Sequence, residues 1–152
     1  MTSPIEKLRE FGYELPAPKA PVASYVPVNR SGNLLYVSGQ ISTNEQGVVT
    51  GLLGENMNVV QGGNAAELAA LNVLSHIVHT AGIPLEEIKR IVKITVLVAS
   101  TPDFTEQHLV ANGCSNMLVA ILGDKGKHAR AAFGVASLPF GAAVEIEAIV
   151  EV

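Results

Sequence analysis

The chain has 152 residues, of which 48% are hydrophobic and 16% are charged, and this predicts one domain over residues 1–152 with a full hydrophobic core. The net charge is −4 and the ten Lys and Arg residues form no basic cluster, which argues against a nucleic-acid partner. The single cysteine excludes an internal disulfide, and metal-binding Cys/His spacing is absent. Without a signal-peptide pattern or an apolar run of bilayer length, we expect a cytoplasmic protein with no membrane segment.

Residues 1–19 are expected to form an N-terminal extension, made of a short helix and a Pro-rich connector. Pro4 after Ser3 is typical of a helix start. The apolar residues of this helix share one face: Ile5, Leu8 and Phe11. The prolines at residues 16–21 then predict a stiff, extended connector.

Two strands joined by a hairpin turn come next, and a long helix follows them. The strands are predicted over residues 24–29 and 34–38, with a weaker strand over residues 48–52. The helix is predicted over residues 60–80, because apolar residues recur there at helical spacing and Gly82 is a C-cap signal.

The long helix carries two apolar stripes. The first consists of Ala66, Ala70, Val73, Ile77 and Ala81, and the second of Leu68, Leu71 and Val78. Because two stripes need two partners, we expect the sheet under the first stripe and the N-terminal helix over the second. His76 and His79 lie on the same helix and are interpreted as surface residues, since no third ligand stands at metal-binding spacing.

The rest of the chain alternates strand and helix. A strand is predicted over residues 89–99, and Thr101-Pro102-Asp103 is predicted to open a helix that extends to Leu122. Two further strands follow within residues 128–152. The order β-β-(β)-α-β-α-β-β predicts an α+β fold, a mixed sheet with its two main helices packed on one face. The other face carries Leu97 and Ile149, which indicates a symmetric oligomer.

The first of the C-terminal strands carries a candidate binding residue, Arg130. Strand alternation puts small residues on its face: Ala132, Gly134 and Ala136. Small side chains leave space on the strand surface beside the guanidinium. Such a site suits a small ligand with a carboxylate, which the guanidinium binds through two parallel hydrogen bonds. An exposed arginine on an edge strand is the simpler interpretation of this stretch alone. His128 is not expected to act together with Arg130 on one ligand.

The last strand places three glutamates on one face: Glu145, Glu147 and Glu151. Glu145 stands at the strand entrance and is the candidate for positioning a water molecule, the alternative being that all three are solvated. Cys114 falls in the apolar stripe of the second helix and is interpreted as a core residue.

Several short motifs occur in one order along the chain. They are Val22-Ala-Ser-Tyr25, Tyr36-Val-Ser-Gly-Gln-Ile41, Ala81-Gly82, Phe104, Ala129-Arg130, Leu138-Pro139 and Val144-Glu-Ile-Glu-Ala-Ile149. In these motifs the chain resembles the reactive intermediate (imine) deaminase family, also called RidA/YjgF and earlier endoribonuclease L-PSP. The resemblance covers residues 20–152. It implies a chorismate-mutase-like α+β fold assembled as a homotrimer, with ligand clefts between subunits.

The resemblance also implies roles for individual residues. Arg130 maps to the arginine that binds the substrate carboxylate, and Glu145 maps to the glutamate associated with the hydrolytic water. The other positions implied to bind substrate are Tyr25, Ser38, Gly39 and Asn112. No metal or organic cofactor is implied, because a protonated imine is already electrophilic.

The chain also departs from the family pattern. Ala132 stands where the family often has a cysteine, and Ser42 stands where a proline is usual. Our first hypothesis is an enzyme that hydrolyses 2-enamine and 2-imine acids to 2-keto acids and ammonia. The second is a non-catalytic binding module for small carboxylates. A ribonuclease is the third, and the acidic chain argues against it.

Overall fold

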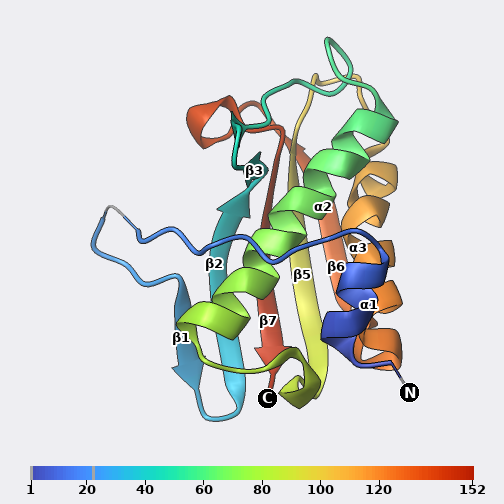
Figure 1. Ribbon diagram of the computed structural model, residues 1–152. Helices are drawn as coiled ribbons and strands as arrows, with labels where there is room; N and C mark the ends of the chain where they lie inside the picture. Colours follow the sequence, from blue (N-terminus) through green and yellow to red (C-terminus); the bar gives the residue numbers. More distant parts are fainter. Residues whose placement is uncertain (1, 22) are drawn as a thin grey trace.

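A five-stranded mixed sheet carries the main helices on one of its faces (Figure 1). The computed structural model describes residues 2–21 and 23–152, so Met1 and Val22, the latter part of the first motif, lie outside the described residues. The sheet order is β1-β2-β7-β5-β6, with β5 and β6 parallel and the other neighbours antiparallel. The strands are β1 (Val28–Ser31), β2 (Leu34–Ile41), β5 (Arg90–Ala99), β6 (Ala129–Val135) and β7 (Val144–Glu151). The predicted α+β class is confirmed.

Three α-helices accompany the sheet, and two short strands form a hairpin of their own. The helices are α1 (Pro4–Glu10), α2 (Val59–Ser75) and α3 (Gln107–Leu122), and the hairpin consists of β3 (Thr43–Asn44) and β4 (Gly47–Val48). A π-helical turn (His76–Thr80) continues α2, and 3₁₀ turns lie at Leu85–Glu87, Gly123–Gly126 and Pro139–Gly141. None of the helices in the described part of the chain combines the length and apolar character that crossing a membrane requires.

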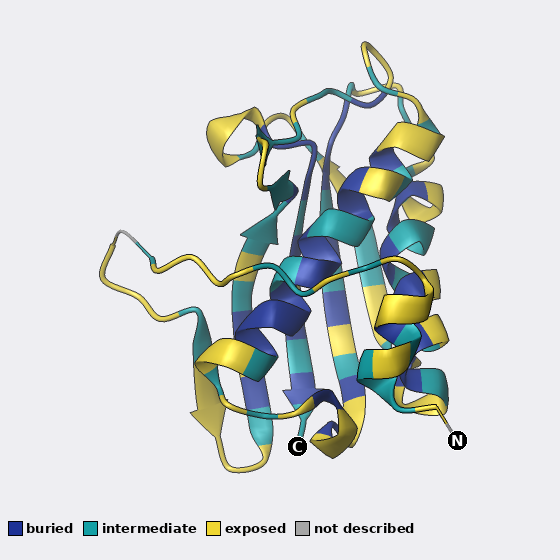
Figure 2. Ribbon diagram, in the orientation of Figure 1, coloured by how far each residue is buried: buried dark blue, intermediate teal, exposed yellow. Residues whose placement is uncertain are grey.

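The pleat of the central strands separates a buried face of the sheet from an open one. The side chains on the helix side are buried: Ile94, Val96 and Val98 of β5, and Val144, Ile146, Ala148 and Val150 of β7 (Figure 2). They share one hydrophobic core with α2 and α3. On the opposite face Tyr36 is 44% exposed and Phe133 47% exposed. The expected uncovered face is therefore present.

The N-terminal extension follows a different path from the predicted one. α1 packs against α3 rather than over the second stripe of α2, and Leu8 of α1 is 1% exposed. The connector crosses α2 (Figure 1), where the Ser75 hydroxyl donates to the carbonyl of Pro16. Tyr13 and Leu15 of the connector pack against the core instead. The prediction about the partner of the second stripe was wrong because the connector occupies that place.

The crossing connector also explains why His76 is not a surface residue. His76 is 3% exposed, whereas His79 is exposed as predicted. The connector runs over this end of α2, and its residues Lys19 to Pro21 line the same pocket as His76. The imidazole Nδ1 lies 2.8 Å from the Thr80 hydroxyl, so the buried ring has a local hydrogen-bond partner.

Two element boundaries also differ from the predictions. α3 begins at Gln107 and not at Pro102, because Thr101 is used in a turn. The Thr101 N–H donates to the carbonyl of Leu53, and its hydroxyl donates to Asp103. The first strand begins at Val28, which leaves Tyr25 in the segment before β1.

The packing of α1 can be tested with Leu8→Ala. Removing this buried side chain should lower the free energy of unfolding by about 2–4 kcal/mol, because it opens a cavity between α1 and α3. Thermal unfolding measures the loss. The control is Val60→Ala, at a position that is 73% exposed, which should change stability by less than about 0.5 kcal/mol. Equal melting temperatures for the two variants would contradict the packing.

Candidate functional site

Glu145 is the first residue of β7 that points to the open face of the sheet. It pairs with Leu97 of β5 and Ile41 of β2, and its side chain is half-buried. Burial, and secondly the nearby charge of Glu147, raise the pKa of Glu145 above the usual range of a glutamate. A carboxyl group whose proton is lost closer to neutral pH is well suited to proton transfer.

A bulge in β2 positions the two motif residues next to Glu145. Between Val37 and Gln40 the pairing with β7 shifts register, so that Ser38 and Gly39 form the irregular step. A Cβ atom on Gly39 would lie 3.0 Å from the carboxyl carbon of Glu145. The absence of a side chain at Gly39 therefore lets the Glu145 carboxyl lie against the backbone of β2.

Ser38 ties the segment that carries Tyr25 to the sheet. Its hydroxyl donates to the carbonyl of Val26 at 2.7 Å, and its N–H donates to the carbonyl of Pro27 at 2.8 Å. Tyr25 is 56% exposed and lines the same pocket as Gly39 and Glu145. Four predicted site residues, Tyr25, Ser38, Gly39 and Glu145, are thus brought together.

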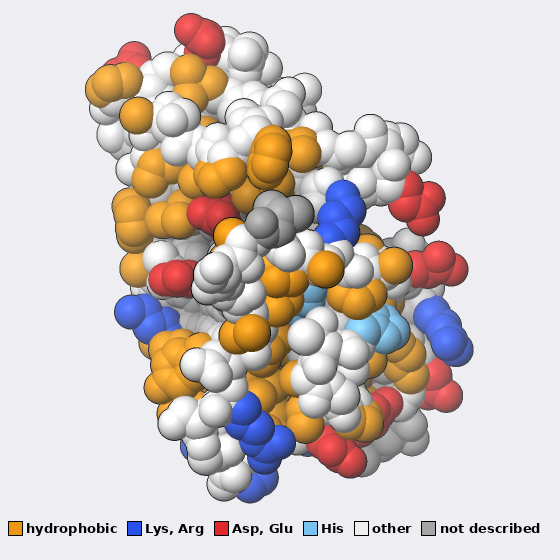
Figure 3. Space-filling model, turned by 90° about the vertical axis from the view of Figure 1, so that its left-hand side faces the viewer, with side chains coloured by type: hydrophobic (Ala, Val, Ile, Leu, Met, Phe, Trp, Pro, Cys, Tyr) orange, Lys and Arg blue, Asp and Glu red, His pale blue; other side chains and the backbone are white. Residues whose placement is uncertain are grey.

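The pocket beside Glu145 has a volume of about 400 Å³ and a largely apolar wall. Phe140 lies at this pocket with 80% of its surface exposed and a backbone φ of 60°, a conformation that a bulky residue rarely adopts. Figure 3 views the molecule from the β1 side of the sheet and shows hydrophobic side chains gathered around acidic ones there. A small ligand with an apolar part fits such a wall.

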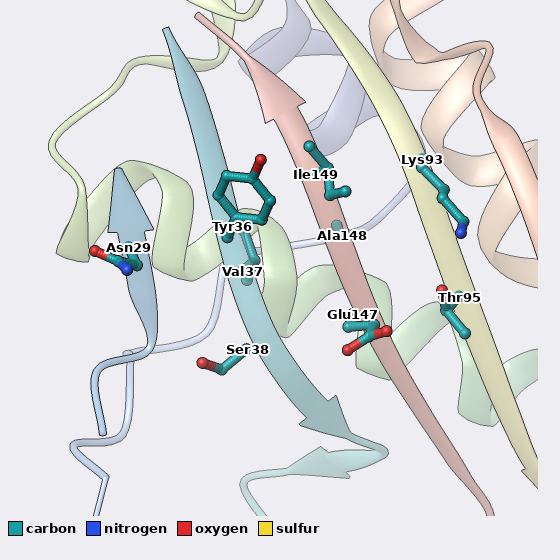
Figure 4. Close-up of a pocket in the computed structure, with 9 residues that line it drawn as sticks. All are labelled: Asn29, Tyr36, Val37, Ser38, Lys93, Thr95, Glu147, Ala148 and Ile149. Carbon is teal, nitrogen blue, oxygen red and sulfur yellow. The ribbon is translucent and has the colours of Figure 1, made fainter. Parts of the chain in front are cut away.

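A second hollow, of about 290 Å³, lies on the open face of the sheet. Its polar side chains come from four neighbouring strands: Asn29 of β1, Ser38 of β2, Glu147 of β7, and Lys93 and Thr95 of β5 (Figure 4). Tyr36 and Ile149 stand beside them. This hollow continues the open face away from Glu145.

Arg130 lies on β6, at the edge of the sheet, and its guanidinium is held by α3. Nη1 donates to Asn112 Oδ1 at 2.9 Å and to Ser115 Oγ at 3.1 Å, while Nη2 donates to the carbonyl of His108 at 3.3 Å. An arginine side chain has five N–H donors, so two have no partner among the described residues and remain for a ligand. Asn112, predicted to bind substrate, thus contacts the predicted carboxylate-binding arginine.

Arg130 and Glu145 point to opposite faces of the same sheet. Arg130 pairs with Ile94 of β5, whose side chain is buried on the helix side, whereas Glu145 pairs with Leu97 on the open side. Paired residues in a sheet point to the same face, and residues three apart on one strand point to opposite faces. The six predicted site residues therefore form two groups in one chain, and the sheet separates them.

His128 and Ser115 belong to the Arg130 group, although only Arg130 and Asn112 were predicted there. The Ser115 hydroxyl lies 2.9 Å from His128 Nε2 as well as 3.1 Å from Arg130 Nη1. His128 and Arg130 are two apart on one extended segment, share a face and both contact Ser115. That they do not act together on one ligand stays a prediction. Ser115 follows Asn112 by three residues, and this helical spacing is the signal that could have found it.

Other expectations about the site chemistry concern Cys114 and metal binding. Cys114 is fully buried, and burial raises the pKa of its thiol to about 12, so it is a core residue as predicted. Within residues 2–21 and 23–152, no group of three His, Cys, Asp or Glu side chains is placed to hold a metal ion.

Comparison with known proteins assigns the chain to a family. The family model described as endoribonuclease L-PSP matches residues 16–152. The chain belongs to this family. It is 47% identical to Protein TCP17 of Trypanosoma cruzi, over 95% of this chain and 91% of that protein. It is also 35% identical to the 2-iminobutanoate/2-iminopropanoate deaminase of Mus musculus, over 88% of this chain and 83% of that protein.

Solved structures of the family have the same fold. Atu1372 from Agrobacterium tumefaciens, a protein of unknown function, matches with a TM-score of 0.91 and 48% identity, over 98% of this chain and 93% of its own. E. coli TdcF, solved with bound serine, matches with a TM-score of 0.63 and 26% identity, over 91% of this chain and 95% of its own. The family and the α+β fold predicted from the motifs are confirmed.

The raised pKa of Glu145 predicts how its replacement changes stability with pH. The folded protein favours the neutral carboxyl, so ionisation of Glu145 lowers the stability of the fold. This loss of stability is absent below the ordinary pKa of a glutamate and complete above the raised pKa of Glu145. Glu145→Gln should therefore raise the melting temperature at pH 7 to 8, and the difference should disappear below about pH 4.

The matched control is Glu45→Gln, at an exposed position in the β3–β4 turn. Its melting temperature should follow that of the native protein at every pH. If Glu145→Gln lowers the melting temperature at pH 7 to 8, the carboxylate makes a net stabilising interaction and the account of its pKa is wrong.

Proposed function

We propose that the protein hydrolyses reactive 2-imine and 2-enamine acids to 2-keto acids and ammonia. The observation that carries the proposal is the pair of groups suited to this reaction: a guanidinium with two free N–H donors, and a half-buried carboxyl of raised pKa beside a small pocket. Relatives named 2-iminobutanoate/2-iminopropanoate deaminase support it, as does the structure of TdcF with an amino acid bound.

Arg130 would hold the substrate through its carboxylate. The remaining N–H donors of a guanidinium pair with the two carboxylate oxygens in one plane, which fixes the orientation of the adjacent imine carbon. α3 keeps the guanidinium in place through three hydrogen bonds, so little conformational entropy is lost when the ligand binds.

Glu145 would move the protons of the hydrolysis. Its carboxylate accepts a proton from water as the water oxygen bonds to the imine carbon, and the C=N bond becomes a single bond. With a protonated imine as substrate, this addition gives a carbinolamine. The carboxyl then delivers its proton to the amine nitrogen and, again a carboxylate, accepts the proton of the carbinol hydroxyl, so that the C=O bond forms as the C–N bond breaks and the keto acid and ammonia leave. A positioned acid–base group contributes about 10²–10⁴-fold to such a step. The reaction needs no metal or organic cofactor.

The two halves of this site would meet only between subunits. In one chain the sheet separates Arg130 from Glu145, so the proposal includes a homotrimer in which the Arg130 edge of one subunit faces the Glu145 pocket of the next. The exposed aromatic side chains of the open face support an assembly, because monomers rarely leave such a face bare. Tyr25, Ser38 and Gly39 would complete the pocket around the substrate, and Asn112 would act through Arg130.

The proposal is tested by ammonia release from freshly generated imino acids. Arg130→Ala should raise KM by at least about 10-fold, because the bidentate pair is lost. Glu145→Gln should lower kcat by about 10²–10⁴-fold with a smaller effect on KM. Arg130→Lys, which keeps the charge but not the planar fork, should lie between native and alanine.

The native protein must accelerate the reaction above its spontaneous rate. Failure to do so across several amino-acid precursors, with a 2-keto acid still bound, would assign the protein to the second hypothesis, a carboxylate-binding module. Undiminished activity in Glu145→Gln would remove Glu145 from the chemistry.

A further inference from the structure

We propose that Ser115 and His128 form a hydrogen-bond relay that positions the guanidinium of Arg130. In this position, the guanidinium edge that carries Nε and Nη2 faces the carboxylate of the ligand. The inference deepens the proposed function and rests on it for the class of ligand. Both residues are positioning residues, since they contact Arg130, or each other, rather than the substrate. The relay runs from a backbone carbonyl through His128 and Ser115 to Arg130.

The first step is the protonation state of His128, which its neighbours define. Nδ1 lies 2.6 Å from the carbonyl oxygen of Gly126, which can only accept a hydrogen bond, so Nδ1 carries the proton. In the neutral ring Nε2 is then an acceptor. The Ser115 hydroxyl at 2.9 Å therefore donates to Nε2.

The second step concerns what Ser115 presents to Arg130. A hydroxyl has one hydrogen, and His128 takes it, so Ser115 Oγ can only accept from the guanidinium. Nη1 makes that bond at 3.1 Å and donates its other hydrogen to Asn112 Oδ1 at 2.9 Å. Without His128 as acceptor, the hydroxyl is free to rotate and turn its hydrogen toward the cation.

The third step is which donors stay free. Both hydrogens of Nη1 and one of Nη2 are bonded to acceptors of α3: Ser115, Asn112 and the carbonyl of His108. Nε and Nη2 lie on the same edge of a guanidinium, and we assign the free Nε–H and the free hydrogen of Nη2 to that edge. That edge matches the two oxygens of a carboxylate.

The surroundings keep His128 neutral. The imidazole is half-buried, and burial lowers its pKa, with a smaller contribution from the Arg130 charge in the same direction and an opposing one from the Gly126 carbonyl. The neighbouring Lys127 forms an ion pair with Asp124 at 3.1 Å. The acceptor on Nε2 is thus preserved near neutral pH.

Two substitutions at His128 separate the relay from a structural role. His128→Asn places an amide N–H near the position of Nδ1 and keeps the bond to Gly126, but it has no acceptor for Ser115. His128→Gln reaches the position of Nε2 with its amide oxygen and keeps the acceptor for Ser115. Ser115→Ala removes the next member of the relay.

The readout is the dissociation constant of 2-oxobutanoate, a small 2-keto acid, measured by NMR titration, with kcat and KM beside it. His128→Asn and Ser115→Ala should each weaken binding and raise KM by about 10-fold, with kcat within about twofold of native. His128→Gln should restore binding to within about threefold. The double variant His128→Asn/Ser115→Ala should be no worse than Ser115→Ala, because both changes break one relay.

Three results would overturn the proposal: equal losses in His128→Asn and His128→Gln, additive losses in the double variant, or a His128 ring that carries its proton on Nε2. The last is read from the ¹⁵N shifts of the imidazole in the native protein and needs no ligand.

This design keeps the relay distinct from the proposed function. If the native protein neither binds 2-oxobutanoate nor turns over imines, the proposed function fails. The relay is then judged by two NMR measurements that need no ligand. The ¹⁵N shifts of His128 report which ring nitrogen carries the proton. The order parameter of the Arg130 Nε–H group should fall in His128→Asn and should stay at the native value in His128→Gln.

Discussion

The pleat of the two central strands is the constraint on which the rest of the structure depends. β5 and β7 must turn one set of aliphatic side chains toward α2 and α3, because this face holds the core. Because side chains alternate along a strand, the remaining side chains of β5 and β7 must then point to the open face. In this alternation, Glu145 points to the open face of the sheet and Arg130 points to the helix side. A one-residue slip would bury Glu145 under the helices, so the core packing that stabilises the fold also separates the two candidate catalytic groups.

Each half of the candidate site is built by local interactions. Gly39 at the bulge gives the Glu145 carboxyl a close approach to the backbone, where burial makes its charge costly. On the other side, three hydrogen bonds from Arg130 to α3 order a long side chain that would otherwise be mobile at an exposed edge. In the proposed reaction, the first arrangement supplies the group that exchanges protons, and the second supplies a cation of fixed direction.

The sequence predicted those features that depend on periodicity and on caps. Alternation correctly gave the faces of β6 and β7, and the end of the long helix was predicted correctly from Gly82, which adopts a φ of 72°. Cys114 was correctly placed in the core because its neighbours in the helix are apolar at helical spacing. The grouping of Tyr25, Ser38, Gly39 and Glu145 came from motifs and not from periodicity, since a bulge such as that at Ser38 and Gly39 leaves no periodic signal.

The features that were missed depend on contacts between distant segments. His76 is buried because the connector crosses α2, and no pattern within the helix reveals that crossing. Thr101 resembles a helix cap, but its N–H is taken by Leu53, almost fifty residues earlier in the chain. Ser115 carried a usable signal in its spacing from Asn112, although its importance is evident only once Arg130 and His128 are seen to converge on it.

The central claim, that one active site is shared by two subunits, is tested most directly by mixing two inactive variants. Arg130→Ala keeps Glu145, and Glu145→Gln keeps Arg130, so a mixed assembly contains interfaces at which both native groups meet. With random mixing at equal amounts, about a quarter of the interfaces are of this kind, and about a quarter of the native activity should return. If mixed assemblies are detected by native mass spectrometry and no activity returns, the site does not lie between subunits and the account is wrong.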